Sequence, residues 1–279
     1  MRKLLWIAAV MLAALVFAAC GDDGDEQPAQ GGESTPAESP GADLNLQTEG
    51  QLTVGAEFPV PGFLELPIEN PTGFEVDFAE ALAEELGVPE VKWVNTPFSG
   101  LFSPAPKRFD MAINEITITD QRARVVDFSE PYFDANQGFL VHKGGPAEGV
   151  TSIADMKGLQ FGFQATTTGG DFIKNEIQPD KQPREYSTLG AATRALANGQ
   201  IDAFLMDVAI GVNIVEDLPE QVAMTGQFET GEQYGVLFEK DNPLREQVNQ
   251  AITAITDSGR LKEMQDEWFP GTAELAVLK

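Results

Sequence analysis

Apolar and polar positions along the chain alternate in blocks that predict strands and helices in turn. Residues 51–56 and 91–95 are apolar-rich runs of strand length. The segment 73–89 between them has an apolar face at helical spacing and stops at Gly87 and Pro89. That face consists of Ala79, Leu82, Ala83 and Leu86. The order strand, helix, strand predicts a parallel, right-handed βαβ unit.

A second distinctive pattern is the segment 109–132, FDMAINEITITDQRARVVDFSEPY. Its apolar run, 111–118, predicts a strand, and the polar residues 119–121 predict a turn that leads into Arg122. A guanidinium is planar, stays charged and can hold a carboxylate with two parallel hydrogen bonds. Arg122 is therefore either a carboxylate-binding residue or one more solvated surface charge.

The rest of the chain continues as short strands separated by helical segments. Strands are predicted at 138–142, 160–164, 184–186, 201–206, 221–224 and 233–238. A helix with core spacing from Leu189 to Leu196 ends at Gly199. Two more helices follow Pro243, and Trp268 in the last of them is expected to pack into the core.

The amino terminus has the pattern of a secretory signal. Arg2 and Lys3 precede an apolar run, 4–19, that is shorter than a membrane-spanning helix and ends in small residues. We therefore expect residues 1–19 to be a signal peptide that is removed on export.

Cys20 is the only cysteine, so it excludes an intrachain disulfide. Its position after two alanines resembles the bacterial lipobox, although Phe17 stands where that motif prefers leucine. The resemblance implies an extracytoplasmic lipoprotein, anchored through lipid on Cys20 to the outer face of the bacterial cell membrane. The alternative is an ordinary signal peptide followed by an incidental cysteine.

The next segment, 20–50, is predicted to be a flexible tether. Residues 21–50 contain eight acidic residues, no basic one, and much Gly, Pro, Ser and Gln. Such a composition offers little apolar surface to compensate for the entropy of ordering the chain.

The charge of the chain excludes one class of partner. The full sequence has 18 basic and 44 acidic residues, and loss of Arg2 and Lys3 leaves 16 against 44, a net charge of −28. Nucleic-acid binding needs cations that face phosphates, so we expect none. The sequence also shows no Ser/His/Asp arrangement, metal-ligand cluster or phosphate loop, and its single histidine is His142.

Three motifs in order resemble family 3 of the extracellular solute-binding proteins, the amino-acid receptors of bacterial ABC importers. They are GFEVDF at 73–78, TITDQR at 117–122 and FSEPY at 128–132, within a match from about Leu52 to Phe269. The resemblance implies an α/β fold of the two-lobed periplasmic-binding-protein type II, with two hinge-crossing strands. Lobe 1 would comprise 51–137 and 235–279, and lobe 2 would comprise 138–234.

The resemblance also implies the function and the principal site residues. The protein would be a monomeric extracytoplasmic receptor, not an enzyme, that needs no cofactor and delivers an amino acid to an ABC transporter permease by hinge closure. Arg122 would pair with the ligand α-carboxylate, and Thr117 would offer a hydroxyl and a backbone N–H. Asp207, at the carboxyl end of a predicted strand, would meet the α-ammonium. Asp202, near the start of that strand, is expected to be structural.

Further site residues follow from the same resemblance. Thr167 and Thr168 match a Gly-Thr-Thr loop that binds the carboxylate, whereas Thr166 replaces its glycine; a plain helix cap is the alternative. Phe98, together with Phe58 or Phe63, would line the ligand unless these rings serve the core. Two carboxylates, Glu57 and Glu115, hint at a basic or amide-bearing ligand side chain; otherwise they are ordinary surface glutamates. These alternatives stay open at this point.

Two rival functions are compatible with the same fold. One is a cyclohexadienyl-dehydratase-like enzyme, in which Glu57 or Glu115 would act as a general acid with a raised pKa. The other is a ligand-sensing accessory protein that signals through a membrane helix. The absence of a second apolar span in the sequence disfavours the sensor.

Overall fold

The computed structural model describes residues 44–269 and 275–279 of the chain. The chain divides into two units, residues 1–37 and residues 38–279, and the described residues belong to the second unit. The predicted signal peptide, Cys20 and most of the predicted tether lie outside the described residues.

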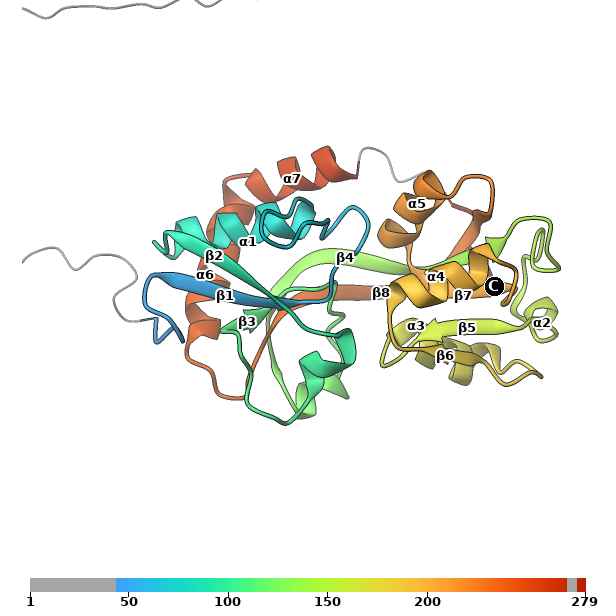
Figure 1. The fold of residues 1–279 in the computed structure, drawn as a ribbon, viewed down its shortest axis with the longest axis horizontal. Helices are drawn as coiled ribbons and strands as arrows, with labels where there is room; N and C mark the ends of the chain where they lie inside the picture. Colours follow the sequence, from blue (N-terminus) through green and yellow to red (C-terminus); the bar gives the residue numbers. More distant parts are fainter. Residues whose placement is uncertain (1–43, 270–274) are drawn as a thin grey trace, which may run out of the picture. The chain divides into compact units, whose positions relative to one another are not determined.

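The described residues form one mixed sheet with helices on both of its faces (Figure 1). Its strands follow the order β2-β1-β3-β8-β4-β7-β5-β6. Two long strands, β4 (Asp127–His142) and β8 (Val222–Phe238), lie in the middle and pair with each other antiparallel along their length. They join two halves of the structure, which we call the first half and the second half (Figure 1).

The first half is built around the amino-terminal strands. It contains β1 (Gln51–Ala56), α1 (Phe74–Glu85), β2 (Glu90–Asn95), η1 (Phe98–Phe102), β3 (Met111–Ala112), η2 (Arg122–Arg124), α6 (Leu244–Asp257) and α7 (Arg260–Trp268). β1 pairs parallel with β2 and with β3, as expected for strands joined through a helix. The predicted parallel strand pair at the start of the chain is therefore present.

The second half is built around β7 and β5. It contains α2 (Ile153–Met156), β5 (Phe161–Gln164), α3 (Thr168–Phe172), η3 (Ile173–Ile177), β6 (Arg184–Tyr186), α4 (Leu189–Ala197), β7 (Ala203–Asp207) and α5 (Val208–Asp217). β5 pairs parallel with β6 and with β7. The expected structural role of Asp202 agrees with its contact, since its Oδ2 accepts a hydrogen bond from the Gln160 backbone at 2.7 Å.

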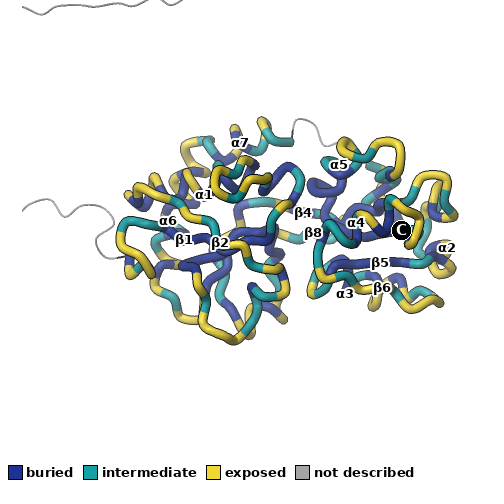
Figure 2. The backbone as a smooth tube through the Cα atoms, in the orientation of Figure 1, coloured by how far each residue is buried: buried dark blue, intermediate teal, exposed yellow. Residues whose placement is uncertain are grey.

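Buried strands form the centre of each half, as Figure 2 shows by the dark colour of β1, β5 and β7. One buried cluster in the second half includes Phe139, Phe161 and Phe163. The largest cluster starts in the first half and continues past the crossing strands to residues such as Leu196 and Phe204. The hydrophobic core thus reaches across the two strands that join the halves.

A glycine at the start of α1 explains the first residue of the GFEVDF motif. Gly73 has φ +135°, and a Cβ there would lie 2.1 Å from the carbonyl oxygen of Phe63. The Glu75 backbone N–H then donates to that same oxygen at 3.2 Å. A side chain at position 73 would break this close approach, which orients the first turn of α1 toward the sheet.

The structure differs from the predicted elements in two places. Of the apolar run 111–118 only Met111–Ala112 is a strand, because Glu115 takes φ +45° and turns the chain away from the ladder. The separately predicted strands 221–224 and 233–238 are the two ends of the single strand β8. Pairing with β4 accounts for this, since residues 226–228 and Glu232 between them also fill ladder positions, with a shift of register between Ala135 and Gln137.

Both ends of the described chain also depart from the predicted boundaries. The tether was expected to reach residue 50, but Leu44 is buried in the core and the Gln47 backbone N–H donates to Asp110 Oδ1 at 2.7 Å. Residues 235–279 were all assigned to the first lobe. Instead, Val277 bridges to Gln227 in the second half, where Leu278 is buried. The lobe limits otherwise remain a prediction.

Candidate ligand-binding site

A cavity lies where the two halves face each other at the crossing strands. Eight of the nine predicted ligand-binding residues line it, namely Glu57, Phe98, Glu115, Thr117, Arg122, Thr167, Thr168 and Asp207. Its volume is about 50 Å³, which is room for one or two water molecules. An amino acid needs more space, so its entry requires the halves to separate or side chains in the cavity to move.

Arg122 is a buried cation that bridges the two halves. Its Nη1 donates to the Thr117 carbonyl oxygen at 2.6 Å, and its Nη2 donates to the Thr166 carbonyl oxygen of the second half at 2.9 Å. The guanidinium carbon lies 5.4 Å from the centre of the Phe98 ring and 4.8 Å from that of Phe102. Burial lowers the pKa of Arg122 to about 10, which leaves it charged at neutral pH.

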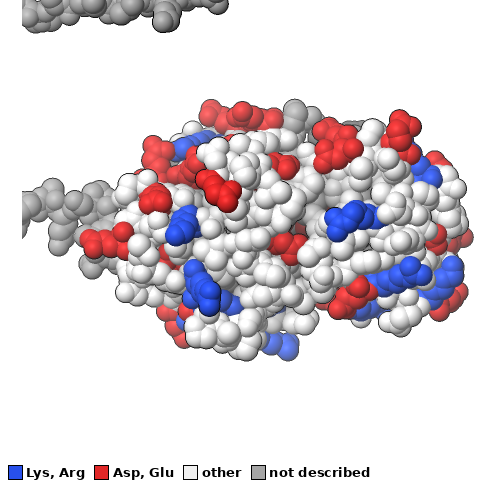
Figure 3. Space-filling view, in the orientation of Figure 1, with Lys and Arg blue, Asp and Glu red and all other residues white. Residues whose placement is uncertain are grey.

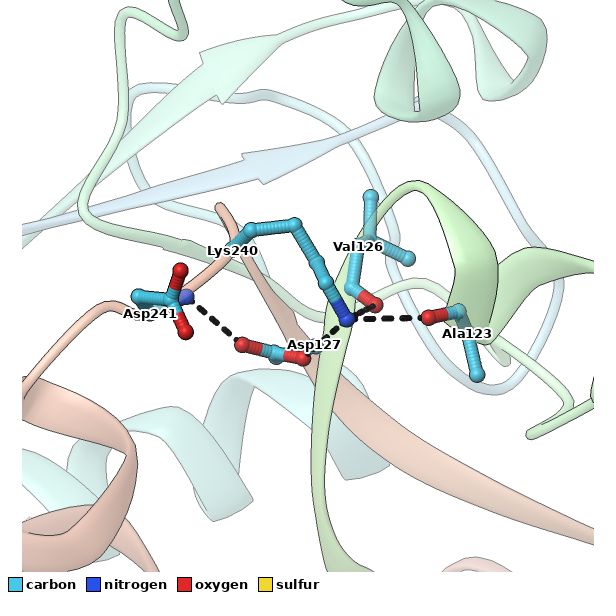
Figure 4. Close-up of polar contacts among 5 residues, drawn as sticks. All are labelled: Ala123, Val126, Asp127, Lys240 and Asp241. Carbon is cyan, nitrogen blue, oxygen red and sulfur yellow. Dashed lines mark hydrogen bonds and ion pairs between the residues drawn. The ribbon is translucent and has the colours of Figure 1, made fainter.

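The turn that carries Arg122 is tied to the end of β8 by a charged cluster (Figure 4). Lys240 Nζ donates to the Ala123 carbonyl oxygen at 2.9 Å and to Asp127 Oδ1 at 2.6 Å. The Asp241 backbone N–H donates to the second carboxylate oxygen of Asp127 at 2.7 Å. η2 is only three residues long, so these contacts supply support that its own hydrogen bonds do not.

Asp207 ends β7 and faces the cavity as the carboxylate of the second half. Its oxygens accept hydrogen bonds from the Tyr234 hydroxyl at 2.7 Å and from Gln137 Nε2 at 2.5 Å. Burial, with a smaller effect of the nearby Glu232, raises the pKa of Asp207 to about 7, although these bonds and Arg122 act in the opposite direction. A cation that replaced solvent at this site would favour the ionised form.

The loop 166–168 has the structure of a helix start with one conformational peculiarity. Thr167 is the N-cap of α3, and its hydroxyl accepts from the Gly170 backbone N–H at 3.3 Å. The Thr168 hydroxyl donates to Glu232 Oε2 at 3.2 Å. Thr166 has φ +65°, a conformation that glycine adopts without strain. The replaced glycine of the motif therefore falls where the backbone is left-handed.

The Glu57 carboxylate accepts hydrogen bonds from the opposite half and is not free to contact a ligand. Its carboxylate accepts from Gln164 Nε2 at 3.1 and 3.2 Å and from the Leu189 backbone N–H at 3.3 Å. Within its own half it accepts from the Phe98 backbone N–H at 2.9 Å. Both oxygens are thus occupied, and the possibility of an ordinary surface glutamate is wrong because the side chain is buried.

Glu115 also lines the cavity, and it is paired with a second buried acid. Its backbone N–H donates to Glu75 Oε1 at 2.8 Å, and its Oε2 accepts from Asn114 Nδ2 at 2.8 Å. Glu75, in the first turn of α1, is fully buried and accepts a 2.5 Å hydrogen bond from the Tyr132 hydroxyl.

Some site residues were not predicted, and one prediction lies elsewhere. Gln137 and Gln164 line the cavity, and Glu232 joins Gln137 through a 2.8 Å hydrogen bond. Gln137 and Glu232 lie in the crossing strands β4 and β8. There the sequence pattern indicated strand positions but no site residues. Phe58 is absent from the cavity lining and packs its ring against Trp93 at 5.5 Å. Phe63, its alternative, is buried in the core.

The described residues contain neither a membrane-spanning helix nor a cluster of metal ligands. No helix in 44–269 or 275–279 is long and apolar enough to cross a membrane. In the same residues no group of three or more His, Cys, Asp and Glu side chains is placed to hold a metal ion.

Figure 3 shows acidic side chains spread over the visible face with basic side chains among them.

Comparisons with known proteins agree with this architecture. The family model described as bacterial extracellular solute-binding proteins, family 3, matches residues 52–271. The L-cystine-binding protein TcyJ of Escherichia coli (strain K12) is 32% identical over 80% of this chain and 84% of its own length. The L-arginine-binding protein of Pseudomonas aeruginosa (strain PAO1) is 32% identical over 78% and 87%, respectively.

Solved structures show the same arrangement of strands and helices. An ancestral arginine-binding protein bound to glutamine is 31% identical and superposes with a TM-score of 0.73, over 80% of this chain and all of that chain. The predicted fold class, a two-lobed α/β fold of type II, is thereby confirmed.

Proposed function

The chain belongs to family 3 of the bacterial extracellular solute-binding proteins, and we propose that it captures an amino acid outside the cytoplasm and delivers it to an ABC importer. The proposal rests mainly on one observation. A buried guanidinium, Arg122, and a buried carboxylate, Asp207, face one cavity from opposite halves. A free amino acid carries the complementary pair of charges, and these need partners when they leave water.

The placement of the two charges suggests how binding is coupled to closure. Arg122 would hold the α-carboxylate together with Thr117 and Thr168, and Asp207 would hold the α-ammonium. A ligand that contacts both halves stabilises the state in which they are close. Each charge-assisted hydrogen bond contributes about 1.5–3 kcal/mol, so two anchors are sufficient for micromolar affinity at roughly −8 kcal/mol.

The side chain of the ligand is expected to be polar, with a basic or amide group. Of the described residues, the acids Glu57, Glu115 and Asp207 and one cation, Arg122, line the cavity, and Glu232 lies beside it on Gln137. This excess of negative charge favours a ligand that brings a cation or several N–H donors. Relatives named for cystine, arginine and glutamine binding fit a polar ligand.

The anchoring of the receptor is proposed from its sequence alone. Residues 1–19 would be cleaved, Cys20 would carry the lipid, and the acidic segment after it would hold a monomeric binding unit near its permease. The two lobes would be 51–137 with 235–279, and 138–234, except that Val277 and Leu278 pack on the second lobe.

Calorimetry of residues 21–279 tests the function, after unfolding and refolding to remove bound ligand. The panel comprises the twenty amino acids with ornithine, citrulline, cystine and ectoine. Arg122→Ala and Asp207→Ala are each expected to abolish measurable binding while the melting temperature shows an intact fold. Arg124→Ala is the matched control, because Arg124 is exposed in the same turn. Unchanged affinity in either cavity variant would reject the assignment.

A further inference from the structure

The buried acid pair Glu75 and Glu115 is not explained by the proposed anchoring of the ligand α-groups. Glu115 is 6% exposed and lines the cavity, and Glu75 lies behind it with no exposed surface. Within the described part of the chain, Glu115 Oε1 and Glu75 Oε2 have no hydrogen-bond partner from a third residue. The two carboxyls are hydrogen-bonded to each other, and this bond needs a retained proton as its donor. Buried polar atoms are normally satisfied, so a donor group that enters the cavity can take the place of that proton.

No cation is among the groups that act on the pair, although Arg122 lines the same cavity. The titratable groups that act on it are Tyr132 from β4, Tyr234 from β8 and Asp207 from the end of β7. None of these three is a cation. Tyr132 donates to Glu75 Oε1, and Asn114 donates to Glu115 Oε2. The remaining polar contact of the pair is the hydrogen bond between the two carboxyls themselves.

Two adjoining buried carboxyls cannot both be ionised easily. Burial raises the pKa of Glu75 to about 7. Burial, and then the charge of Glu75, raise the pKa of Glu115 well above its ordinary value. The two groups titrate as a pair, and the pair therefore retains a proton at neutral pH.

We propose that Glu115, backed by Glu75, is the group that selects a ligand with a cationic side chain, and that it releases a proton when that cation binds. The inference rests on the proposed function, in which Arg122 and Asp207 engage the α-carboxylate and the α-ammonium. The Glu115 carboxyl, which lines the cavity, is then left for a third charged group of the ligand. Its O–H bond breaks, the proton passes to solvent, and the carboxylate accepts hydrogen bonds from the side-chain ammonium or guanidinium.

Proton release gives the affinity a definite pH dependence. Where the pair is protonated before binding, the ligand must displace a proton, so its affinity rises about tenfold per pH unit. The effect ends above the pKa of the pair. Asp207 also has a pKa near 7. Its contact with the α-ammonium therefore releases some protons from Asp207 with any amino acid that binds. The contribution of Glu115 is the additional proton released by a basic ligand.

Calorimetry in two buffers of different ionisation enthalpy, at pH 6.5, counts the released protons. Lysine and arginine are the basic probes, and glutamine is the neutral probe. The unmodified chain should release about one more proton with a basic probe than Glu115→Gln does. Glu80→Gln, an exposed glutamate of α1, is the control and should leave the count unchanged.

An infrared difference spectrum of the unmodified chain provides a second readout that needs no variant. Binding of lysine or arginine should remove the C=O stretching band of a protonated carboxylic acid.

Basic probes that bind with equal proton counts in both chains, or with that band unchanged, would overturn the inference and leave the proposed function intact. Tight binding of glutamine alone would also overturn it. Failure of the unmodified chain to bind any amino acid would reject the proposed function, and the inference with it.

Discussion

Thr166 is a residue that the site retains at a conformational cost. Its φ of +65° is left-handed, and its carbonyl oxygen accepts the hydrogen bond that Arg122 donates across the cavity. A left-handed conformation costs a non-glycine residue about 1–2 kcal/mol. The departure from the Gly-Thr-Thr motif was visible in the sequence, and the backbone angle supplies its physical meaning.

Thr166→Gly is expected to stabilise the unliganded chain. Relief of the strain exceeds the extra entropy that glycine loses on folding, so the free energy of unfolding should rise by about 0.5–1 kcal/mol. Urea unfolding measures it. Thr167→Gly is the neighbouring control, because Thr167 is an N-cap with φ −87°, and its loss should lower that free energy by a few tenths of a kcal/mol. A lower stability for Thr166→Gly would contradict the strain.

Motif matching identified residues that line the cavity but not all their partners. Arg122, Asp207 and Thr168 lie at the cavity as expected. The sequence did not indicate the hydrogen-bond partners of Glu57 and Glu75, because those partners, such as Gln164 and Tyr132, are far away along the chain. A periodic pattern shows which face of an element is apolar. It does not show which distant N–H or hydroxyl a buried carboxylate will meet.

Among the elements, the short turn η2 depends most on its neighbours. Lys240 reaches it from beyond β8, and Asp127 holds Lys240 in place (Figure 4). The ion pair is partly exposed, with 46% of the Lys240 side chain accessible. Its contribution to global stability is therefore about 1 kcal/mol or less. Its effect on the position of Arg122 is more direct.

Lys240→Ala is expected to weaken amino-acid binding about fivefold, with little change in melting temperature. The variant loses the support of the turn that positions the guanidinium, which costs about 1 kcal/mol of binding free energy. Calorimetry and a thermal melt measure the two quantities. Lys262→Ala removes a comparable pair with Asp266 on α7, where both side chains are mostly exposed and distant from the turn. Equal affinities for Lys240→Ala and Lys262→Ala would show that the cluster does not position Arg122.

Helices were predictable from spacing, whereas the segment that carries the site was less so. Helices α1 and α4 begin and end close to the predicted residues. The run 111–118 has the composition of a strand, but its pairing is interrupted after Ala112, where Glu115 takes a left-handed conformation and its backbone N–H donates to Glu75. It meets β8 again at the bridge between Thr117 and Tyr234. A tertiary contact thus overrides the local preference where a side chain turns toward the cavity.

For the molecule as a whole, the halves are connected both by chain and by contacts across the cavity. β4 and β8 provide the covalent connection. Arg122 to Thr166, and Glu57 to Gln164 and Leu189, provide hydrogen bonds that exist only while the halves are close. The protein therefore supplies part of the closing energy itself, and a ligand needs to add the remainder.

Glu57→Gln is expected to shift the unliganded protein toward the open state. An amide places an NH₂ group opposite the donors Gln164 Nε2 and the Leu189 N–H, and bonds to a charged acceptor are worth about 1.5–3 kcal/mol. The apparent affinity falls as the closed fraction falls, here by about tenfold or more. A fluorescence transfer pair with one dye on each half reports the closed fraction, and calorimetry reports the affinity.

Glu65→Gln is the control for this shift, since Glu65 accepts from the Gly62 N–H within the first half alone. If Glu57 instead reads the ligand side chain directly, Glu57→Gln would change which amino acid binds best and leave the closed fraction untouched. A shift in closure with unchanged ligand preference distinguishes the interlobe contact from the ligand contact. Both oxygens of Glu57 already have partners in the closed protein, so the first result is the one that the geometry supports.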